Sequence, residues 1–263
     1  MQLQRITCSI TNFIEREVKK RKRQGVVAGM SGGLDSSVVV SLAVKALGNH
    51  GVFGLILPDS KITPKSDILD AVRLAENLKI EYRVIEIETM KRATLRKLPK
   101  NRLAEGNLSS RFRMCILYYF AGIMDRLVIG TSDKSELMLG YYTKHGDGAA
   151  DIFPIADLYK TEIKQLAGHL EIPSTIIEKK SSPRLWKGQT AETEIGLNYE
   201  VIDKILQHFD RDTINKSGIS KRNINIIRRL VAANKHKQDI SPICKLDGNE
   251  SFSNSQLRGR KGR

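Results

Sequence analysis

The stretch Val26-Val-Ala-Gly-Met-Ser-Gly-Gly-Leu-Asp-Ser-Ser37 decides the fold of this chain, and a largely apolar run, Val38 to Ala43, follows it. A short β-prone run, a glycine-rich turn and an apolar run predict a strand, a loop and a helix in that order. Glycines permit positive φ and let backbone N–H groups approach an oxygen closely, while the helix adds its positive N-terminal end. The pattern therefore predicts a site that holds a phosphate chain. An ordinary Gly-Ser turn that caps a helix is the alternative.

The loop differs from the common ATPase loop, which reads G-x-x-x-x-G-K-[ST] and uses its lysine to bind phosphates. Here the lysine is absent, and Ser31, Ser36 and Ser37 offer hydroxyl donors instead. Asp35 puts a carboxylate beside the bound anion, which requires a cation between the two groups. The loop therefore predicts a bound cation at Asp35.

Strand-like and helix-like segments alternate along the first half of the chain. Strands are predicted at 26–29, 52–57, 82–88 and 127–130, and helices at 3–22, 36–47, 66–78 and 111–125. This alternation predicts an α/β fold with a doubly wound, Rossmann-like parallel sheet flanked by helices. Ligands of such sheets bind beyond the carboxyl ends of the strands, where the glycine loop and Gly130-Thr131 would meet.

The helix predicted at 66–78 is amphipathic, with Ile68, Leu69, Val72, Ala75 and Leu78 expected to point inward. From Tyr159 the chain is expected to be mainly helical, with an irregular stretch at 181–198. We predict a single domain over residues 1–246 and a basic, disordered tail over residues 247–263, because the tail is rich in Ser, Asn, Gly and basic residues.

Composition limits the setting and the partners of the protein. No apolar stretch of the 263 residues approaches the ~20 needed to span a bilayer, and the N-terminus lacks the apolar block of a signal peptide. Three scattered cysteines form no metal-ligand pair or disulfide framework, so we expect a reducing, cytoplasmic setting without membrane contact. The net charge of +15 suits anionic ligands. For the tail, weak nucleic-acid binding and a solvated tail without a ligand both stay open.

Several motifs in order carry a family resemblance. Together with the loop, they read Asn107-Leu-Ser-Ser-Arg-Phe-Arg-Met114, Ile129-Gly-Thr-Ser-Asp-Lys-Ser-Glu136, Gly140-Tyr-Tyr-Thr-Lys-His-Gly-Asp-Gly-Ala-Ala-Asp151 and Phe153-Pro-Ile-Ala-Asp-Leu-Tyr-Lys160. The loop resembles that of the N-type ATP pyrophosphatases, which have an adenine nucleotide alpha-hydrolase-like fold. The whole set closely resembles the ammonia-dependent NAD synthetases, in particular the archaeal type, over about residues 25 to 240.

The resemblance implies a ligase that carries out the last step of NAD biosynthesis. The nicotinic acid carboxylate of deamido-NAD attacks the α-phosphate of ATP, and ammonia then converts the adenylate into NAD and AMP. ATP is a co-substrate, Mg2+ is the cofactor, and a homodimer is expected. The chain has no room for an added amidase domain, so free ammonia, or ammonia supplied by a separate protein, is the implied nitrogen donor.

The resemblance also assigns residues. ATP is expected at Gly29, Met30, Ser31, Gly32, Gly33, Leu34, Asp35, Ser36, Thr131, Lys160 and Ser182, with Ser31, Asp35 and Lys160 in the catalytic step. Mg2+ is expected at Asp35 and Glu136. Deamido-NAD is expected at Arg111, Lys144, Asp151, His236 and Lys237. The sequence departs from the family at Ser109-Ser110 and at Ser181-Ser182-Pro183.

Two other classes of protein remain as alternatives. One is a tRNA-modifying enzyme with the same loop, which the basic charge suits, although thiolating members carry paired cysteines that this chain lacks. The other is a nucleic-acid-binding protein that keeps the fold without catalysis. Such a protein has no need of Asp35, Glu136 and an intact glycine loop together.

Overall fold

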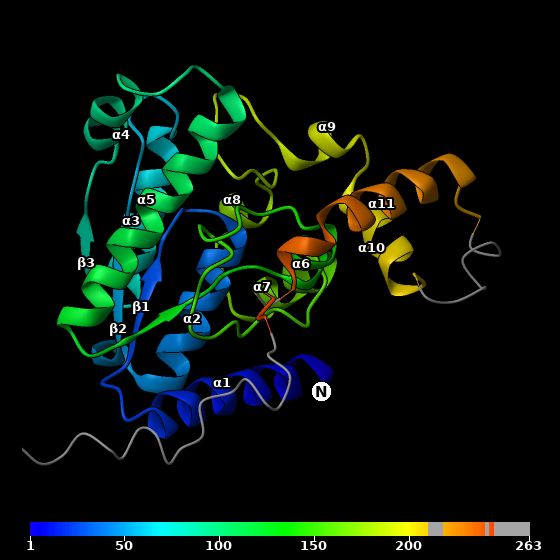
Figure 1. Cartoon of the computed structure of the whole chain (residues 1–263). Coiled ribbons are helices and arrows are strands. Elements are labelled where there is room, and N and C mark those ends of the chain that lie inside the picture. Colours follow the sequence, from blue (N-terminus) through cyan, green and yellow to red (C-terminus); the bar gives the residue numbers. More distant parts are fainter. Residues whose placement is uncertain (210–217, 240–241, 245–263) are drawn as a thin grey trace, which may run out of the picture.

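The computed structural model describes residues 1–209, 218–239 and 242–244. A parallel four-stranded sheet in the order β3-β2-β1-β4 forms its centre (Figure 1). Its strands are β1 (Val26–Gly29), β2 (Val52–Ile56), β3 (Glu81–Val84) and β4 (Leu127–Ile129). The predicted α/β fold with a parallel sheet is thus confirmed. Because β1 lies between β2 and β4, the loop after β1 opens at the point where the strand order reverses, which is where such sheets bind ligands.

Alternate side chains of the central strands enter two different hydrophobic clusters. Val26 and Ala28 of β1 belong to one cluster, and Val27 between them belongs to the other. β4 follows the same rule, with Val128 on the face opposite to its two neighbours. Both faces of the sheet are therefore buried, which explains why these strands read as continuous apolar runs.

Helices cover both faces of the sheet (Figure 1). One face carries α2 (Leu34–Leu47), α3 (Lys65–Asn77), α7 (Lys160–His169) and α8 (Ser174–Ile177), with α1 (Gln2–Lys20) packed against α2 and α7. The other face carries the long helix α5 (Arg102–Ile123), preceded by the short α4 (Glu88–Leu95). Phe120 of α5 stacks on Phe53 of β2 with ring centroids 5.5 Å apart.

Some predicted boundaries were wrong. The helix expected from residue 111 begins at residue 102, because the side chain of Asn101 accepts a hydrogen bond from the N–H of Ala104 and caps it. The third strand ends at residue 84, and the Glu86 carboxylate then accepts the N–H of Glu88 at the start of α4. The inward prediction for Leu69 was also wrong, since its side chain is exposed and Leu74 of the same helix is buried instead.

A third hydrophobic cluster lies beside the sheet layers (Figure 1). It is built from α6 (Lys134–Leu139), α9 (Ala191–Ile195), α10 (Tyr199–Gln207) and α11 (Lys221–Asn234). Two short 3-10 turns outside this cluster, η1 (Asn49–Gly51) and η3 (Lys235–Lys237), complete the described elements. The mainly helical second half is confirmed. No described helix is long and apolar enough to cross a membrane. The predicted tail, residues 247–263, lies outside the described residues, and the single domain stays a prediction.

Candidate active site

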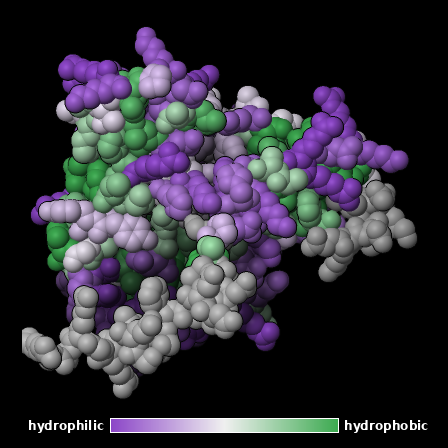
Figure 2. Space-filling view, viewed as in Figure 1, coloured by the Kyte–Doolittle hydropathy of each residue, from purple (hydrophilic) through white to green (hydrophobic). Residues whose placement is uncertain are grey.

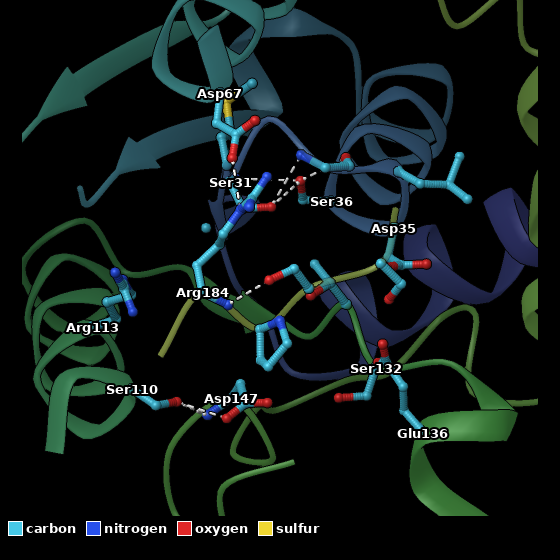
Figure 3. Close-up of a pocket in the computed structure, with 18 of the residues that line it drawn as sticks. Ser31, Asp35, Ser36, Asp67, Ser110, Arg113, Ser132, Glu136, Asp147 and Arg184 are labelled. Atoms are coloured by element: carbon cyan, nitrogen blue, oxygen red, sulfur yellow. Dashed lines mark hydrogen bonds and ion pairs between the residues drawn. The ribbon is translucent and has the colours of Figure 1, made fainter. Parts of the chain in front are cut away.

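A cavity of about 480 Å³ opens at the carboxyl edge of the sheet, between the glycine loop, β4 and the segment that follows α8. Every residue predicted to bind ATP or a metal lines this cavity, except Gly32. None of the five residues predicted to bind deamido-NAD does. Figure 3 shows Asp35 and Glu136 on one side of the cavity and Arg113 across from them. The structure therefore brings the predicted ATP residues together into one site.

The glycine loop is held in place by its own serines. Ser31 Oγ and Ser36 Oγ lie 3.0 Å apart, and Ser31 Oγ also accepts the N–H of Gly33. Gly32 has a φ of +72°, a conformation that favours glycine. Gly33 is the N-cap of α2 and has no side chain to cap it, so the first N–H groups of the helix remain available to an anion.

Lys160 lies at the centre of three carboxylates beside the loop. Its Nζ is 2.8 Å from Asp35 Oδ2, 2.8 Å from Asp133 Oδ2 and 2.8 Å from Glu136 Oε1. The lysine side chain is only 2% exposed, and that of Asp133 is fully buried. The ammonium also lies 5.3 Å from the ring centre of Tyr199. Within the described residues, no group of three or more His, Cys, Asp or Glu side chains is arranged to hold a metal ion.

Burial and mutual charge shift the acid–base properties of this cluster. Burial raises the pKa of Asp133 to about 6, although the Lys160 ammonium acts in the opposite direction. Burial likewise raises the pKa of Glu136 well above its usual range. For Lys160, burial opposes the charged form, but attraction to the three carboxylates outweighs it and raises the pKa well above its usual value. Lys160 therefore stays protonated although it is buried, because three carboxylates surround it.

Two buried acids position the cluster. Asp133 is the N-cap of α6, and its Oδ1 accepts the N–H of Glu136 at 2.8 Å. Asp203 of α10 accepts the hydroxyl of Ser135 at 2.5 Å and the N–H of Thr161 at 2.8 Å. Ser135 Oγ in turn accepts the N–H of Lys160 at 3.1 Å. These bonds fix the N-termini of α6 and α7 against each other and so hold Glu136 and Lys160 face to face.

The segment after α8 closes another wall of the cavity and is tied to the glycine loop. Lys179 Nζ donates to Gly32 O at 2.7 Å and pairs with Asp67 at 2.9 Å. Arg184 Nε pairs with the other oxygen of Asp67 at 3.0 Å. Ser182 donates to Gln189 O at 2.6 Å, so the hydroxyl predicted to contact ATP is used within this segment.

Arg113 forms part of the opposite wall. Its Nε donates to Leu57 O at 2.9 Å, and burial lowers its pKa. Among the described residues it has no carboxylate partner within 4.0 Å. Arg113 is thus a partly buried cation that faces a cavity suited to an anionic nucleotide.

Four of the residues predicted to bind deamido-NAD form a separate group outside the cavity. Arg111 donates to Lys144 O at 3.3 Å, and Lys144 Nζ donates to His236 O at 2.8 Å. Lys237 Nζ donates to Gly140 O at 2.6 Å and Tyr142 O at 3.0 Å, and burial lowers its pKa. The structure therefore links α5, the loop after α6 and η3.

Asp151 is not part of this group. It lies beside the middle of β4, where its Oδ2 accepts the N–H of Val128 at 2.7 Å. Its backbone N–H donates to Val128 O at 2.9 Å. The Asp151 carboxylate therefore accepts a backbone hydrogen bond from the edge strand β4, and its contact with deamido-NAD stays a prediction.

Sequence reasoning missed several residues of the site. Asp133 was part of a quoted motif but was given no role, although an Asp three residues before Glu136 is a capping signal. Tyr199, Asp203 and Asp67 gave no signal, because their partners lie far away in the sequence.

The parallel sheet, the Ser-Gly-Gly loop at its carboxyl edge and the acidic cluster define a nucleotide-binding α/β protein of the adenine nucleotide alpha-hydrolase type. The sequence profile described as NAD synthase matches residues 6–241. The chain belongs to the NAD synthase family.

Relatives and solved structures agree with this assignment. The chain is 43% identical to the NH(3)-dependent NAD(+) synthetase of Archaeoglobus fulgidus, covering 94% of this chain and 98% of the relative. It is 44% identical to the NH(3)-dependent NAD(+) synthetase of Methanocaldococcus jannaschii, and the match covers 91% of this chain and 96% of the relative. The NH3-dependent NAD synthetase of Campylobacter jejuni superimposes with a TM-score of 0.81 at 34% identity, covering 93% and 100%. The NMN synthetase of Francisella tularensis does so with a TM-score of 0.84 at 33% identity, covering 94% and 100%.

Proposed function

We propose that this protein is an ammonia-dependent NAD synthetase that converts deamido-NAD, ATP and ammonia into NAD, AMP and pyrophosphate. The observation that carries the proposal is the cavity in which the glycine loop faces the cluster of Lys160 and its three carboxylates. This arrangement suits an adenylation, in which a carboxylate attacks the α-phosphate and pyrophosphate leaves.

The residues of the chain have separate roles in this reaction. Backbone N–H groups at the start of α2 hold the leaving pyrophosphate, together with the hydroxyl of Ser31. Lys160 and Arg113 offset the repulsion between the anionic substrates, which would otherwise keep the two reacting groups apart. Ammonia then attacks the carbonyl carbon of the adenylate, and AMP is the leaving group.

The acidic cluster fits a magnesium ion. One oxygen of Asp35 and one of Glu136 each lie 2.8 Å from the Lys160 ammonium, and carboxylate oxygens are the ligands that Mg2+ prefers. Bound there, a magnesium ion would supply neutralisation of the phosphate charge. Asp35 and Glu136 are the residues that we assign to hold it.

The nitrogen donor in this proposal is free ammonia. Support comes from the relatives named as NH(3)-dependent, which the chain matches over 98% of the length of one and 96% of another. We also assign the protein to the cytoplasm, because its three cysteines are free and scattered, as is usual in a reducing compartment. A second candidate substrate is the mononucleotide, nicotinic acid mononucleotide, which the similarity to an NMN synthetase favours. The chemistry at the carboxylate is the same for both.

We also propose a homodimer. Support comes from one face of α5, on which Tyr119 and Ile123 are 66% and 63% exposed and Cys115 is exposed as well. Arg111 continues this row at the same four-residue spacing, so a predicted deamido-NAD residue shares the apolar face. Figure 2 shows hydrophobic surface on the side of the molecule where α5 and β3 lie in Figure 1. A second copy of the chain is the occupant that would bury this row beside the substrate.

One assay tests the function. Purified protein is incubated with ATP, Mg2+, deamido-NAD and either ammonium or glutamine, and AMP and NAD are separated by chromatography. We expect equimolar AMP and NAD with ammonium and no NAD with glutamine. Parallel reactions with nicotinic acid mononucleotide rank the two substrates by kcat/KM. Asp35→Ala, checked for folding by circular dichroism, is the inactive control. Absence of AMP with both nicotinate substrates would exclude the proposed activity.

A further inference from the structure

The position of Lys160 among the carboxylates has a consequence for the order in which ligands enter the site. Its ammonium lies 2.8 Å from Asp35, Asp133 and Glu136, at the point where their oxygens converge. An ammonium and a divalent cation cannot occupy one position, and side by side they would repel each other. The cluster in this structure is therefore already neutralised in part by a cation of the chain itself.

Asp133 belongs to this cluster as much as the two predicted metal ligands do. Its Oδ1 caps α6, and its Oδ2 pairs with the Lys160 ammonium at 2.8 Å. The side chain is fully buried. Asp35 Oδ1 is also buried, and none of the described residues donates a hydrogen bond to it. A buried carboxylate oxygen without a donor is costly, so Asp35 Oδ1 has capacity for a further cation.

The Lys160 side chain lies at the wall of the cavity. Its backbone is fixed by the bond from its N–H to Ser135, and its side chain lines the cavity predicted to hold the triphosphate. Phosphate oxygens in that cavity would offer the ammonium new acceptors of the same charge as the carboxylates. The exchange needs only rotation about the bonds of the lysine side chain.

We propose that Lys160 and the divalent cation compete for one position among Asp35, Asp133 and Glu136, so that the cation enters with the triphosphate and not before it. Asp133 is then a third carboxylate of the cation site, and Lys160 is its resident counter-ion in the free protein. This inference rests on the proposed use of ATP with Mg2+.

The test measures binding of Mn2+, as a probe for Mg2+, to the full-length protein without nucleotide, by electron paramagnetic resonance. Lys160→Met is expected to bind Mn2+ ~10-fold or more tightly than wild type, because it removes the competing charge. Lys134→Met is the matched control, since Lys134 does not line the cavity and pairs with the exposed Asp157 at 2.7 Å. It should bind Mn2+ as wild type does. Adding Asp133→Asn to Lys160→Met should weaken binding again, because Asn keeps the N-cap and removes the charge.

Equal affinity of wild type and Lys160→Met for Mn2+ would overturn the proposal. If Lys160→Met does not fold, Lys160→Gln replaces it, and wild-type protein supplies an independent measurement. Mn2+ alone should leave its Tm nearly unchanged, whereas Mn2+ with α,β-methylene-ATP should raise it. A rise with Mn2+ alone that equals the rise with both ligands would also overturn the proposal. None of these measurements depends on NAD formation, so failure of the proposed reaction is detected separately.

Discussion

Replacing Gly32 with alanine tests whether the glycine loop must keep its present position. Gly32 has a φ of +72°, and a Cβ added there would lie 2.0 Å from Asp67 O and 2.8 Å from Asp67 C. Gly48 offers a matched control, because it has the same φ of +72° but nothing within 4 Å of an added Cβ. Both alanine variants carry the cost of positive φ, and only Gly32→Ala carries the clash.

The expected magnitudes follow from these contacts. Positive φ costs an alanine ~1–3 kcal/mol, which both variants share. At Gly32 the loop must also move by about 1 Å to relieve the contact with Asp67 O. That shift breaks the 2.7 Å bond from Lys179 Nζ to Gly32 O. A hydrogen bond to a charged group contributes ~1.5–3 kcal/mol, so Gly32→Ala should be less stable than Gly48→Ala by about this amount.

The loss of activity should be larger than the loss of stability explains. A misplacement of ~1 Å in a site that positions phosphates costs ~100-fold in rate. We expect Gly32→Ala to lose about this factor in kcat/KM for ATP, and Gly48→Ala to stay close to wild type. Urea unfolding gives the free energies, and steady-state kinetics with ATP varied gives kcat/KM. Wild-type kcat/KM in Gly32→Ala would refute the reasoning, because the loop would then tolerate displacement.

Three further predictions follow from other parts of the structure. Asp203→Ala should lower the free energy of unfolding by ~2–4 kcal/mol, because it removes the acceptor of two buried hydrogen bonds. Asp157→Ala, whose carboxylate is 97% exposed beside Lys134, should change that free energy by less than ~0.5 kcal/mol in the same urea titration. Lys144→Ala should raise the KM for deamido-NAD by about tenfold while leaving the KM for ATP unchanged in steady-state kinetics. Tyr119→Glu with Ile123→Glu should convert the protein to a monomer in sedimentation, because charges are costly in a buried apolar contact.

Each of these has a clear contrary outcome. Equal stability of the two aspartate variants would mean that the α10 carboxylate does not hold α6 and α7 together. If Lys144→Ala changed only the KM for ATP, Lys144 would bind ATP and its assignment to deamido-NAD would be wrong. An unchanged sedimentation coefficient would remove the α5 face from the proposed interface.

The parts of the fold that the sequence predicts well are those set by neighbours along the chain. The strand, glycine loop and helix at residues 26–47 follow from local pattern, and so do β2 and β4. The start of α5 was missed by nine residues, because the predicted start at residue 111 overlooked the capping signal of Asn101 and Glu105. The burial of Leu69 was predicted wrongly, because helical spacing identifies an apolar face of the helix but not which edge of that face packs against the sheet.

The parts of the site that could not be predicted depend on contacts between distant segments. Lys160 was expected at the phosphates, yet its ammonium pairs with Asp35, 125 residues away in the sequence. The bond between Ser135 and Asp203 spans 68 residues. Nothing in the local pattern around Asp203 distinguishes it from a surface acid on an amphipathic helix. Only the packing of α10 against α6 and α7 buries it and gives it a role.

The two groups of predicted binding residues differ in how the chain supports them. The ATP residues line one cavity within a single copy, where hydrogen bonds from the loop, α6 and α7 already fix them. The deamido-NAD residues Arg111 and Lys144 are held through backbone carbonyls beside an exposed apolar helix face. A ligand bound there would be open to water unless that face were covered. A second copy on α5 would cover it and exclude water from the adenylate, which is the species that hydrolysis would destroy. Dimer formation and protection of the intermediate would then depend on the same surface, so a monomeric variant should hydrolyse ATP to AMP without forming an equal amount of NAD.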